Sequence, residues 1–490
     1  MRQLDFARFT SGFRQRVALK RLTLLLLLAV TAAKAATAQS AVCYTIDTLR
    51  VRQHWDGWGV SLCWWAAQCG KWDDEKIDEI VEWLVSPDGL NYSHFRYNIG
   101  GGDDPENRHC TPHHMAQGKG LRAEMEGFKD FSGDSYHPER DAAQRKILLK
   151  IKEKRPDAVF EAFSNSCPYY MTYSGCVGGH ADGSKDNLKP EYYEEFAHYL
   201  VDVCKHYRDA YGIEFKTLEP FNESATSYWY QGGSQEGCHF DYASQIAFLR
   251  VLAPILRQSG LNTLISASDE TSLNHSIQAF EAYRDAGVLP LVGQWNTHTY
   301  EGDNKQRVRL AKMVRETRKP LWMSETGSGG KGIEGNLRLT QRLFDDIQFL
   351  QPEAWLDWQY MEEKSDQWCT LRGSFAGQTY AKVKNYYVRQ QCTRFIKRGY
   401  DILASECRQT LAAVSARRDT LVLVLLNEGD DTRHSISLAC RTAEPSAFNV
   451  YRTSESENLQ PIADGATLQG DTLCIALPKQ SVTTLVIPLR

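Results

Sequence analysis

The chain has 490 residues, of which 42% are apolar, and its formal net charge at pH 7 is −4. This length and apolar content are sufficient for two or three domains, or for one barrel with an appended domain. The acidic balance argues against a protein that binds nucleic acid through its phosphates, because such binding requires a basic face.

The first 38 residues are typical of a secretory signal peptide. Basic residues continue to Arg21, an apolar run follows at 22–30, and small residues lead to a predicted cleavage site after residues 36–38. The apolar run is too short to cross a bilayer and no later run approaches spanning length, so we expect no membrane span. Cleavage would remove seven Lys or Arg and one Asp, which lowers the net charge to −10. We therefore expect an acidic protein that is secreted or periplasmic.

The chain contains 13 cysteines, which in an exported protein allow up to six disulfides. The pairs Cys63/Cys69 and Cys167/Cys176 are candidates because they are close in sequence, although sequence alone does not fix the connectivity. Paired Cys-x-x-Cys spacing is missing, which argues against a zinc site.

Strand and helix patterns alternate from residue 44 onward. Residues 44–51 alternate apolar and polar side chains like a half-exposed strand, and residues 55–65 hold four tryptophans. Further strands are predicted at 92–99, 158–163, 215–221, 263–267, 294–300, 320–324 and 354–360. Apolar residues at helical spacing follow them, for example Ile77, Ile80, Val81 and Leu84. Counted from Trp55, these are eight strands.

Eight strand and helix units predict a parallel (β/α)8 TIM barrel over residues 55–390, because parallel strands need helical crossovers. A doubly wound sheet is the structural alternative. The Gly-Gly-Gly at 100–102 is not a dinucleotide fingerprint, because it opens a polar loop rather than a helix.

The pattern changes in the last hundred residues. Short β-rich runs separated by turn-rich segments occur at 421–426, 435–438, 448–451, 472–477 and 482–487. They predict a C-terminal antiparallel β-sandwich at 391–490. We see no low-complexity linker, so we expect the two parts to pack rigidly.

Two predicted strands end in glutamates. Residues 218–224 end in Asn222-Glu223-Ser224 after the fourth strand, and residues 320–327 contain Glu325 at the end of the seventh. Catalytic groups of such barrels lie at the C-terminal ends of strands, so both carboxyl groups should face one opening. Glycoside hydrolysis needs such a pair, one as acid and the other as nucleophile or base. The charge of one would raise the pKa of the other and keep it protonated.

These glutamates and their surroundings resemble glycoside hydrolase family 30 of clan A, especially its endo-β-1,6-galactanases. The stretches that carry the resemblance are 56–65, 95–101, 164–175, 235–240 and 385–387. It covers nearly the whole mature chain, including the sandwich. The resemblance also implies that residues 39–54 contribute an N-terminal strand to the sandwich.

The resemblance implies a role for each matching residue. Glu223 would be the acid/base and Glu325 the nucleophile, with retention of configuration. Asn222 would bind the sugar 2-hydroxyl, where a bond that strengthens in the transition state contributes most. The remaining implied roles are orientation of Glu325 by Arg96 and Tyr300, and an apolar sugar floor from Trp358 with Tyr169 or Tyr170. The family usually has tryptophans at 169–170, so this chain departs from its pattern there.

Several residues have a plain structural interpretation beside a functional one. At least one tryptophan of residues 55–65, with Trp58 as candidate, could stack on a sugar, while the others fill the barrel. Glu236 could contact substrate or be a solvated loop acid. Near other strand ends, Asp269, Glu270 and Asp357 could contact substrate or form caps and salt bridges. The cluster His109, His113 and His114 indicates an exposed loop rather than a metal site, so we expect no metal and no cofactor.

Together these features predict a monomeric retaining endo-hydrolase that acts on a polysaccharide or oligosaccharide containing β-1,6-galactosidic linkages, as in arabinogalactan side chains. A β-1,6-glucanase, a xylanase and an exo-acting glycosidase remain alternatives. A non-catalytic carbohydrate-binding protein is an alternative from another class, but the intact Glu223/Glu325 pair argues against it. For retention we expect the carboxyl groups to lie about 5–5.5 Å apart.

Overall fold

The computed structural model describes residues 41–102, 125–327, 332–363, 365–367, 369–439, 448–463 and 465–490. The predicted signal peptide and the cluster His109, His113 and His114 lie outside these residues. Among the helices that are described, none combines the length and the apolar character needed to cross a membrane.

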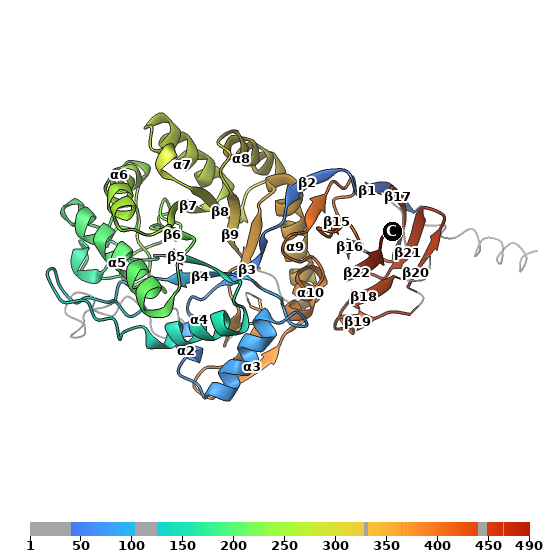
Figure 1. Cartoon of the computed structure of the whole chain (residues 1–490), viewed down its shortest axis with the longest axis horizontal. Coiled ribbons are helices and arrows are strands. Elements are labelled where there is room, and N and C mark those ends of the chain that lie inside the picture. The colour runs from blue at the N-terminus through green and yellow to red at the C-terminus, as the bar shows by residue number, and fades with distance from the viewer. Residues whose placement is uncertain are drawn as a thin grey trace, which may run out of the picture.

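Eight parallel strands close into a barrel in the order of the chain (Figure 1). The first and last strands, β3 and β10, pair in register from Gly57 with Ala354 to Val60 with Asp357. The strands are β3 (Gly57–Ser61), β4 (His94–Asn98), β5 (Val159–Phe163), β6 (Thr217–Glu219), β7 (Leu264–Ser272), β8 (Gln294–Glu301), β9 (Leu321–Thr326) and β10 (Ala354–Asp357). The predicted (β/α)8 barrel is confirmed.

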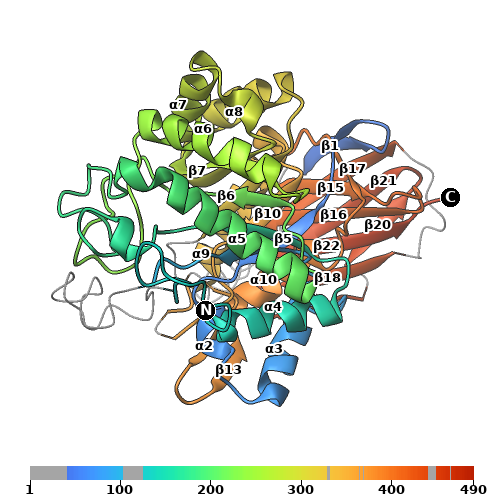
Figure 2. The same cartoon turned by 60° about the vertical axis from the view of Figure 1, so that its left-hand side comes forward.

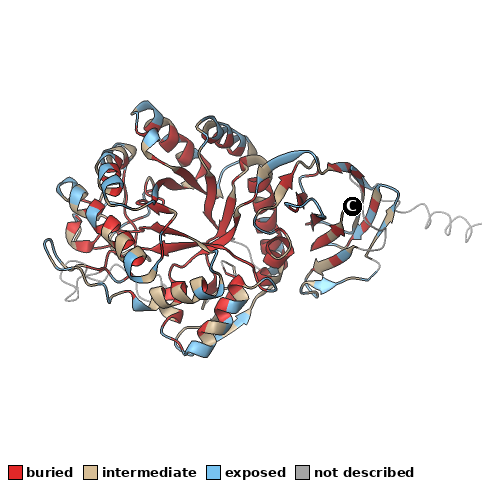
Figure 3. Ribbon diagram, in the orientation of Figure 1, coloured by how far each residue is buried: buried red, intermediate tan, exposed pale blue. Residues whose placement is uncertain are grey.

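Helices surround the barrel and turn their apolar faces toward it (Figure 3). In α5, for example, Phe196, Leu200, Val203 and Tyr207 recur at helical spacing and are buried. The helices are α2 (Trp65–Cys69), α3 (Asp74–Val85), α4 (Ala142–Lys154), α5 (Tyr193–Tyr211), α6 (Tyr242–Gln258), α7 (Leu273–Asp285), α8 (Asn304–Glu316), α9 (Gly332–Asp345) and α10 (Lys384–Thr393). Three 3₁₀ turns occur at Tyr169–Met171, Pro190–Tyr192 and Leu289–Leu291, and a π turn at Asp346–Leu350 continues α9.

Two packed sheets form a sandwich beside the barrel (Figure 2). The smaller sheet has the order β1-β17-β21-β20, and the larger has the order β19-β18-β22-β16-β15-β14-β2. Their strands are β1 (Val42–Asp47), β2 (Val51–His54), β14 (Asp401–Leu403), β15 (Thr410–Val414), β16 (Thr420–Asn427), β17 (Thr432–Ala439), β18 (Asn449–Thr453), β19 (Gln460–Pro461), β20 (Ala466–Gln469), β21 (Thr472–Leu477) and β22 (Ser481–Pro488). Both N-terminal strands therefore belong to the sandwich sheets, β1 pairing with β17 and β2 with β14.

The sequence analysis missed some details of the strands. The predicted strand 44–51 is two strands, because a turn at residues 47–50 separates them, with the Arg50 amide donating to the Asp47 carbonyl at 3.1 Å. A small sheet of β11 (Met361–Glu362), β12 (Leu371–Ser374) and β13 (Thr379–Lys382) was not predicted. Nor were the short sandwich strands β14, β15, β19 and β20.

Polar contacts of two buried side chains, Gln391 and Asp345, connect the barrel to the sandwich. On α10, the fully buried Gln391 donates to the Thr453 hydroxyl at 2.9 Å and accepts a hydrogen bond from Thr484 at 2.5 Å. Arg408 binds the carboxylate of Asp345 at the end of α9, at 2.7 and 2.5 Å. Because such groups cost free energy when left unpaired, these contacts favour one relative placement of the two parts.

The predicted disulfide pairs Cys63/Cys69 and Cys167/Cys176 are wrong, because Cys63, Cys69 and Cys167 are free thiols. Each points to a different neighbour. Cys63 Sγ accepts from the Asn165 amide at 3.3 Å, while Cys69 Sγ faces the Met361 sulfur at 3.7 Å. Cys167 Sγ instead lies 3.8 Å from Cys238 Sγ.

Candidate active site

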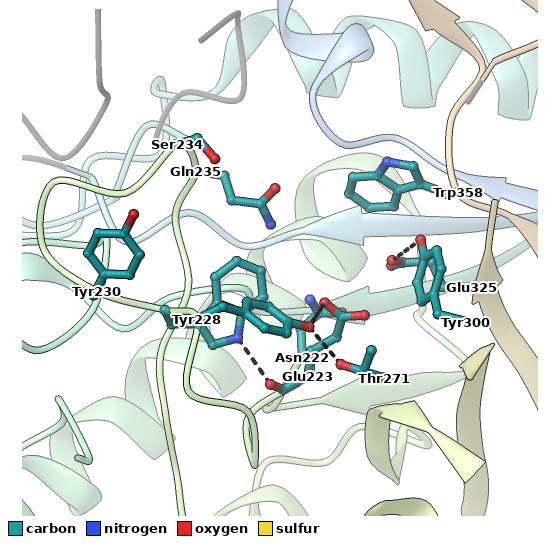
Figure 4. Close-up of a pocket in the computed structure, with 11 residues that line it drawn as sticks. Asn222, Glu223, Tyr228, Tyr230, Ser234, Gln235, Thr271, Tyr300, Glu325 and Trp358 are labelled. Atoms are coloured by element: carbon teal, nitrogen blue, oxygen red, sulfur yellow. Dashed lines mark hydrogen bonds between the residues drawn. The ribbon is translucent and has the colours of Figure 1, made fainter. Parts of the chain in front are cut away.

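A cavity of about 400 Å³ opens at the C-terminal ends of the barrel strands (Figure 4). It is lined by Asn222, Glu223, Tyr228, Trp229, Tyr230, Ser234, Gln235, Thr271, Tyr300, Glu325 and Trp358. The two glutamates singled out from the sequence therefore face the same cavity, as the strand count predicted. Five of the lining residues come from one segment, 228–235, in the loop after β6.

Glu223 follows β6 in a left-handed backbone conformation, with φ at 52°. Non-glycine residues adopt this conformation only when their surroundings hold it. Here the Glu223 amide donates to the Asp269 carbonyl at 2.8 Å, and the Trp229 indole donates to the Glu223 carbonyl at 3.0 Å. The carboxylate accepts from the Tyr228 hydroxyl at 2.5 Å, and its other oxygen lies 3.0 Å from His298 Nδ1. Both the backbone and the side chain of Glu223 are thus fixed.

Glu325 lies on β9 with a donor on each carboxylate oxygen. Arg96 Nη1 donates to Oε2 at 2.8 Å, and the Tyr300 hydroxyl donates to Oε1 at 2.9 Å. Burial raises the pKa of Glu325 and Glu223 adds to that rise, whereas the His298 and Arg96 cations oppose it. One oxygen of Glu223 and one of Glu325 lie within 4.8 Å of each other. The predicted neighbours Arg96 and Tyr300 are therefore in contact with Glu325.

Arg96 on β4 is fully buried and contacts three carboxylates. Besides Glu325, it binds Glu161 at 3.1 Å and Asp269. Burial acts to lower the pKa of Arg96, but Asp269, Glu325 and Glu161 outweigh it and the pKa is raised. The guanidinium is therefore a permanent cation at the base of the site.

His298 on β8 is a site residue that the sequence analysis did not identify. Its Nδ1 lies 3.0 Å from Glu223 and 3.8 Å from Glu325, and its Nε2 lies 3.4 Å from Asp269. Burial acts to lower the pKa of His298, but the carboxylates outweigh it and raise the pKa to about 10. The sequence did contain a signal for His298. Residues 298 and 300 lie on the same face of a strand, and Tyr300 was already a candidate site residue.

Asn222 and Trp358 also line the cavity. Asn222 is nearly buried, and its side-chain oxygen has no hydrogen-bond partner within the described part of the chain. Trp358 packs edge-on against Trp64, with ring centroids 5.5 Å apart. The cavity is therefore lined both by the Asn222 amide, whose oxygen can accept a further hydrogen bond, and by the flat apolar ring of Trp358.

Besides Arg96, which contacts Glu325 from below, four further residues predicted to bind substrate are not among those that line this cavity. Trp58 lies near the start of β3, at the opposite end of the barrel, where its indole donates to the Ile396 carbonyl at 2.7 Å. The hydroxyls of Tyr169 and Tyr170 bind Asp130 and Glu195, respectively. The structure thus places Trp58 in the barrel core rather than against a sugar.

The fourth is Glu236, which is fully buried beneath the cavity. Its carboxylate accepts from Asn98 at 2.6 Å, from the Trp64 indole at 2.9 Å and from Ser166 at 3.0 Å. Burial raises its pKa to about 7. Glu236 thus connects several loops and is not the solvated loop acid of the plain interpretation.

Asp269, Glu270 and Asp357 are buried and paired within the protein. Asp269 binds Arg96 and Ser324. The other two have separate partners, with Glu270 accepting from the Gln245 amide at 2.9 Å and Asp357 accepting from Arg389 at 2.7 Å. They support the loops at the mouth of the barrel and do not line the cavity.

A (β/α)8 barrel with two glutamates facing each other across a cavity, at the ends of its fourth and seventh strands, defines the class of glycoside hydrolases. Comparison with known proteins agrees with this class. The profile of O-glycosyl hydrolase family 30 matches residues 41–288. The chain is 31% identical over 434 residues to an endo-β-1,6-galactanase of Hypocrea rufa, covering 85% of this chain and 88% of that protein. The chain therefore belongs to O-glycosyl hydrolase family 30.

A second relative is an exo-β-1,6-galactobiohydrolase of Bifidobacterium longum. It is 24% identical over 406 residues, which cover 63% of this chain but only 26% of that longer protein. Among solved structures, a conserved exported protein from Bacteroides fragilis has a TM-score of 0.76 at 20% identity, covering 91% of this chain and 100% of that one. The family 30 xylanase C of Talaromyces cellulolyticus has a TM-score of 0.69 at 16% identity, covering 91% and 99%. At these identities the structures support the fold alone.

Proposed function

We propose that this protein is a retaining endo-hydrolase that cleaves β-1,6-galactosidic linkages in galactan, as in arabinogalactan side chains. The observation that carries the chemistry is the Glu223/Glu325 pair in one cavity. The preference for galactan rests on the 31% identity to a relative named as an endo-β-1,6-galactanase. We further propose that the protein is exported, which the N-terminal signal pattern supports.

In the first step, Glu325 attacks the anomeric carbon while Glu223 protonates the leaving oxygen. In the second, Glu223 takes a proton from water, which displaces Glu325 from the sugar. Arg96 and Tyr300 each hold one oxygen of Glu325 and so orient it for attack. One oxygen of each carboxylate lies within 4.8 Å of the other, and this proximity supports retention, because inverting enzymes hold their carboxyl groups about 6.5–9.5 Å apart to admit a water molecule.

Asn222 and Trp358 have complementary roles in binding the sugar that is attacked. The Asn222 amide binds the 2-hydroxyl, and its unpartnered oxygen supports this assignment because a buried polar atom gains most from a new hydrogen bond. Trp358 offers an apolar surface to the carbon-bound hydrogens of the ring. These contacts hold the anomeric carbon against Glu325, which reduces the entropic part of the barrier.

Azide rescue tests the two catalytic roles. Glu325→Ala should lower kcat by about 10⁴- to 10⁶-fold, the range over which removal of one member of a catalytic unit lowers kcat. With an activated aryl galactoside, azide should restore turnover and give the α-galactosyl azide, because it enters from the side that Glu325 vacated. Glu223→Ala is the matched variant and should give the β-azide, because its nucleophile is intact. The same anomer from both variants would contradict the assignment, as would wild-type turnover in Glu325→Ala.

A substrate panel tests the linkage. Purified enzyme is compared on β-1,6-galactan, β-1,6-glucan and xylan, and the products are separated by size over time. We expect galactan to be cleaved fastest, with internal cuts that release a ladder of oligosaccharides. Activity on xylan alone would contradict the proposed substrate, and release of a single short product from the outset would contradict endo action.

A further inference from the structure

The cavity extends well beyond the two carboxylates. Glu325, Tyr300 and Trp358 lie at one end in Figure 4, Glu223 and Tyr228 lie in the middle, and Tyr230 lies at the other end. Ser234 and Gln235 line the same cavity and lie between Tyr230 and Trp358 in this view. The sugar that Glu325 attacks occupies only the first end, so the other end is available to a second part of the substrate.

The proposed double displacement determines which part of the substrate occupies this other end of the cavity. The leaving oxygen departs from the anomeric carbon on the side away from Glu325, and it takes its proton from Glu223. The leaving sugar therefore extends past Glu223, toward Tyr230. This step, like the rest of the inference, depends on the proposed function.

Tyr230 differs from the two aromatic residues that precede it. Trp229 is buried and donates to the Glu223 carbonyl, and the Tyr228 hydroxyl is bonded to the Glu223 carboxylate. Both support the acid/base. Tyr228 and Tyr230 both line the cavity and are 43% and 48% exposed, but within the described part of the chain the Tyr230 ring has no hydrogen bond to Glu223. Large exposed rings that line cavities are typical of ligand contacts, because they bury much apolar area when a ligand arrives.

The backbone that carries Tyr230 is held in place. It forms a bridge with His180, and the next amide, of Gln231, donates to the His180 carbonyl at 3.1 Å. Gly179 packs so closely that a Cβ added there would lie 2.5 Å from the backbone of Trp229. A ring on a fixed backbone loses little conformational freedom when it binds, which favours a preformed binding surface.

We propose that Tyr230, with Ser234 and Gln235 beside it, forms the subsite for the galactosyl residue on the leaving side of the scissile bond. In a β-1,6 linkage the leaving oxygen is attached to an exocyclic carbon, so the leaving ring begins one carbon farther from that oxygen than in linkages through a ring carbon. An aromatic surface displaced from Glu223 suits this geometry. The Tyr230 ring would stack on the sugar, and the two polar side chains would bind its hydroxyls.

Two substrates distinguish an effect on this subsite from an effect on the rest of the active site. A β-1,6-galactotetraose places a sugar beyond Glu223, whereas β-1,6-galactobiosyl fluoride has only fluoride as leaving group. Tyr230→Ala should lower the ratio of kcat/KM for the tetraose to kcat/KM for the fluoride by about tenfold, the loss of one aromatic contact. Tyr230→Phe should keep the wild-type ratio, because the ring and not the hydroxyl provides the surface. Turnover of the fluoride also reports directly that each variant is folded.

Phe131→Ala is the matched control, because it removes a ring that is 59% exposed but does not line the cavity. It should leave the ratio unchanged. An unchanged ratio in Tyr230→Ala would overturn the subsite, and so would a tenfold lower ratio in the Phe131→Ala control. Absence of wild-type turnover of both galactosyl substrates would instead overturn the proposed function, together with the ligand assigned to this subsite.

Discussion

His298 is one of two buried cations among the carboxylates of the site, the other being Arg96. Charges buried this deeply persist only when they are paired, because an isolated ion loses its hydration. Protonated His298 offsets the repulsion between Glu223 and Glu325. It also opposes the rise in pKa that burial imposes on Glu325, which favours the ionised form of the proposed nucleophile.

Replacing His298 should therefore shift the pH dependence of activity. In His298→Gln the cation that lowers the pKa of Glu325 is lost, so that pKa rises further. Because Glu325 attacks only when ionised, the acidic limb of kcat/KM should move to higher pH by about one unit. The measurement is a pH profile of kcat/KM on a galactosyl fluoride, whose leaving group needs no acid. His54→Gln, at an exposed histidine on β2, should leave the limb in place. A limb that does not move in His298→Gln would show that the cation does not control Glu325.

At the residue scale, sequence predicts groups whose position follows from a strand end. Glu223 and Glu325 were found this way, because a barrel brings strand ends together, whereas Arg96 and Tyr300 were implied by the family resemblance. The position of Glu236 under the cavity and the role of His298 could not be found, because each depends on partners from several separate loops or strands. Trp58 shows the converse limit, since an indole near a strand start looks the same in sequence whether it meets a sugar or the barrel core.

Among the elements, the loop after β6 is central, because it carries both Glu223 and Tyr230. Its shape depends on a close contact between Gly237 and Trp229. A Cβ added at Gly237 would lie 2.3 Å from the Trp229 ring, which is buried and cannot turn away easily. Since the same indole donates to the Glu223 carbonyl, this glycine controls the placement of the acid/base through Trp229.

Gly237→Ala should consequently impair both activity and stability. We expect the displaced indole to lower kcat at least about tenfold, and overpacking to lower the free energy of unfolding by about 1–3 kcal/mol. Steady-state kinetics and urea unfolding measure the two effects. Gly429→Ala is the control, because the nearest atom to an added Cβ there lies 3.9 Å away, so neither quantity should change. Normal kcat in Gly237→Ala would show that Trp229 does not position Glu223.

Helices and strands were predictable where the repeat of apolar residues extends over enough positions to be recognised. Each barrel helix longer than ten residues has a buried stripe that its sequence displays, as in α3 and α5. The sheet of β11, β12 and β13 was missed because its strands have two to four residues, too few to show alternation. The same limit applies to β14, β19 and β20 in the sandwich, whereas β15 is buried along its whole length and shows no alternation.

At the scale of the whole molecule, the two parts share the N-terminal segment. Strands β1 and β2 lie in the sandwich sheets although the barrel follows them in sequence. This pairing was expected from the family resemblance and not from composition, because residues 44–51 alternate like any half-exposed strand. Together with the contacts of Gln391 and Arg408, it favours cooperative unfolding of barrel and sandwich.

The buried acids of the barrel determine how stability depends on pH. Burial raises the pKa of Asp141, Glu236 and Glu270 to about 7 each. In the unfolded chain the same groups have pKa values of about 4. Between these values the folded protein keeps protons that the unfolded chain has released, so stability must fall as pH rises through this window. Titration of His298 also lowers stability as pH rises, but over a higher range of pH, because its pKa of about 10 exceeds the unfolded value of about 6.5.

We therefore expect the free energy of unfolding to be greatest near pH 4, where the fall begins, and to decrease toward pH 8. Glu236→Gln removes one of the titrating groups, so its decrease between pH 5 and 7 should be shallower than that of the wild type by up to about 1.4 kcal/mol per pH unit. The slope is the quantity to compare, because the amide also loses acceptor capacity toward Trp64, Asn98 and Ser166 and lowers stability at every pH. Urea unfolding at half-unit pH intervals measures it. Glu334→Gln, at an exposed glutamate on α9, should reproduce the wild-type slope. A wild-type slope in Glu236→Gln would mean that Glu236 is ionised throughout this range, held by its hydrogen-bond donors against the cost of burial.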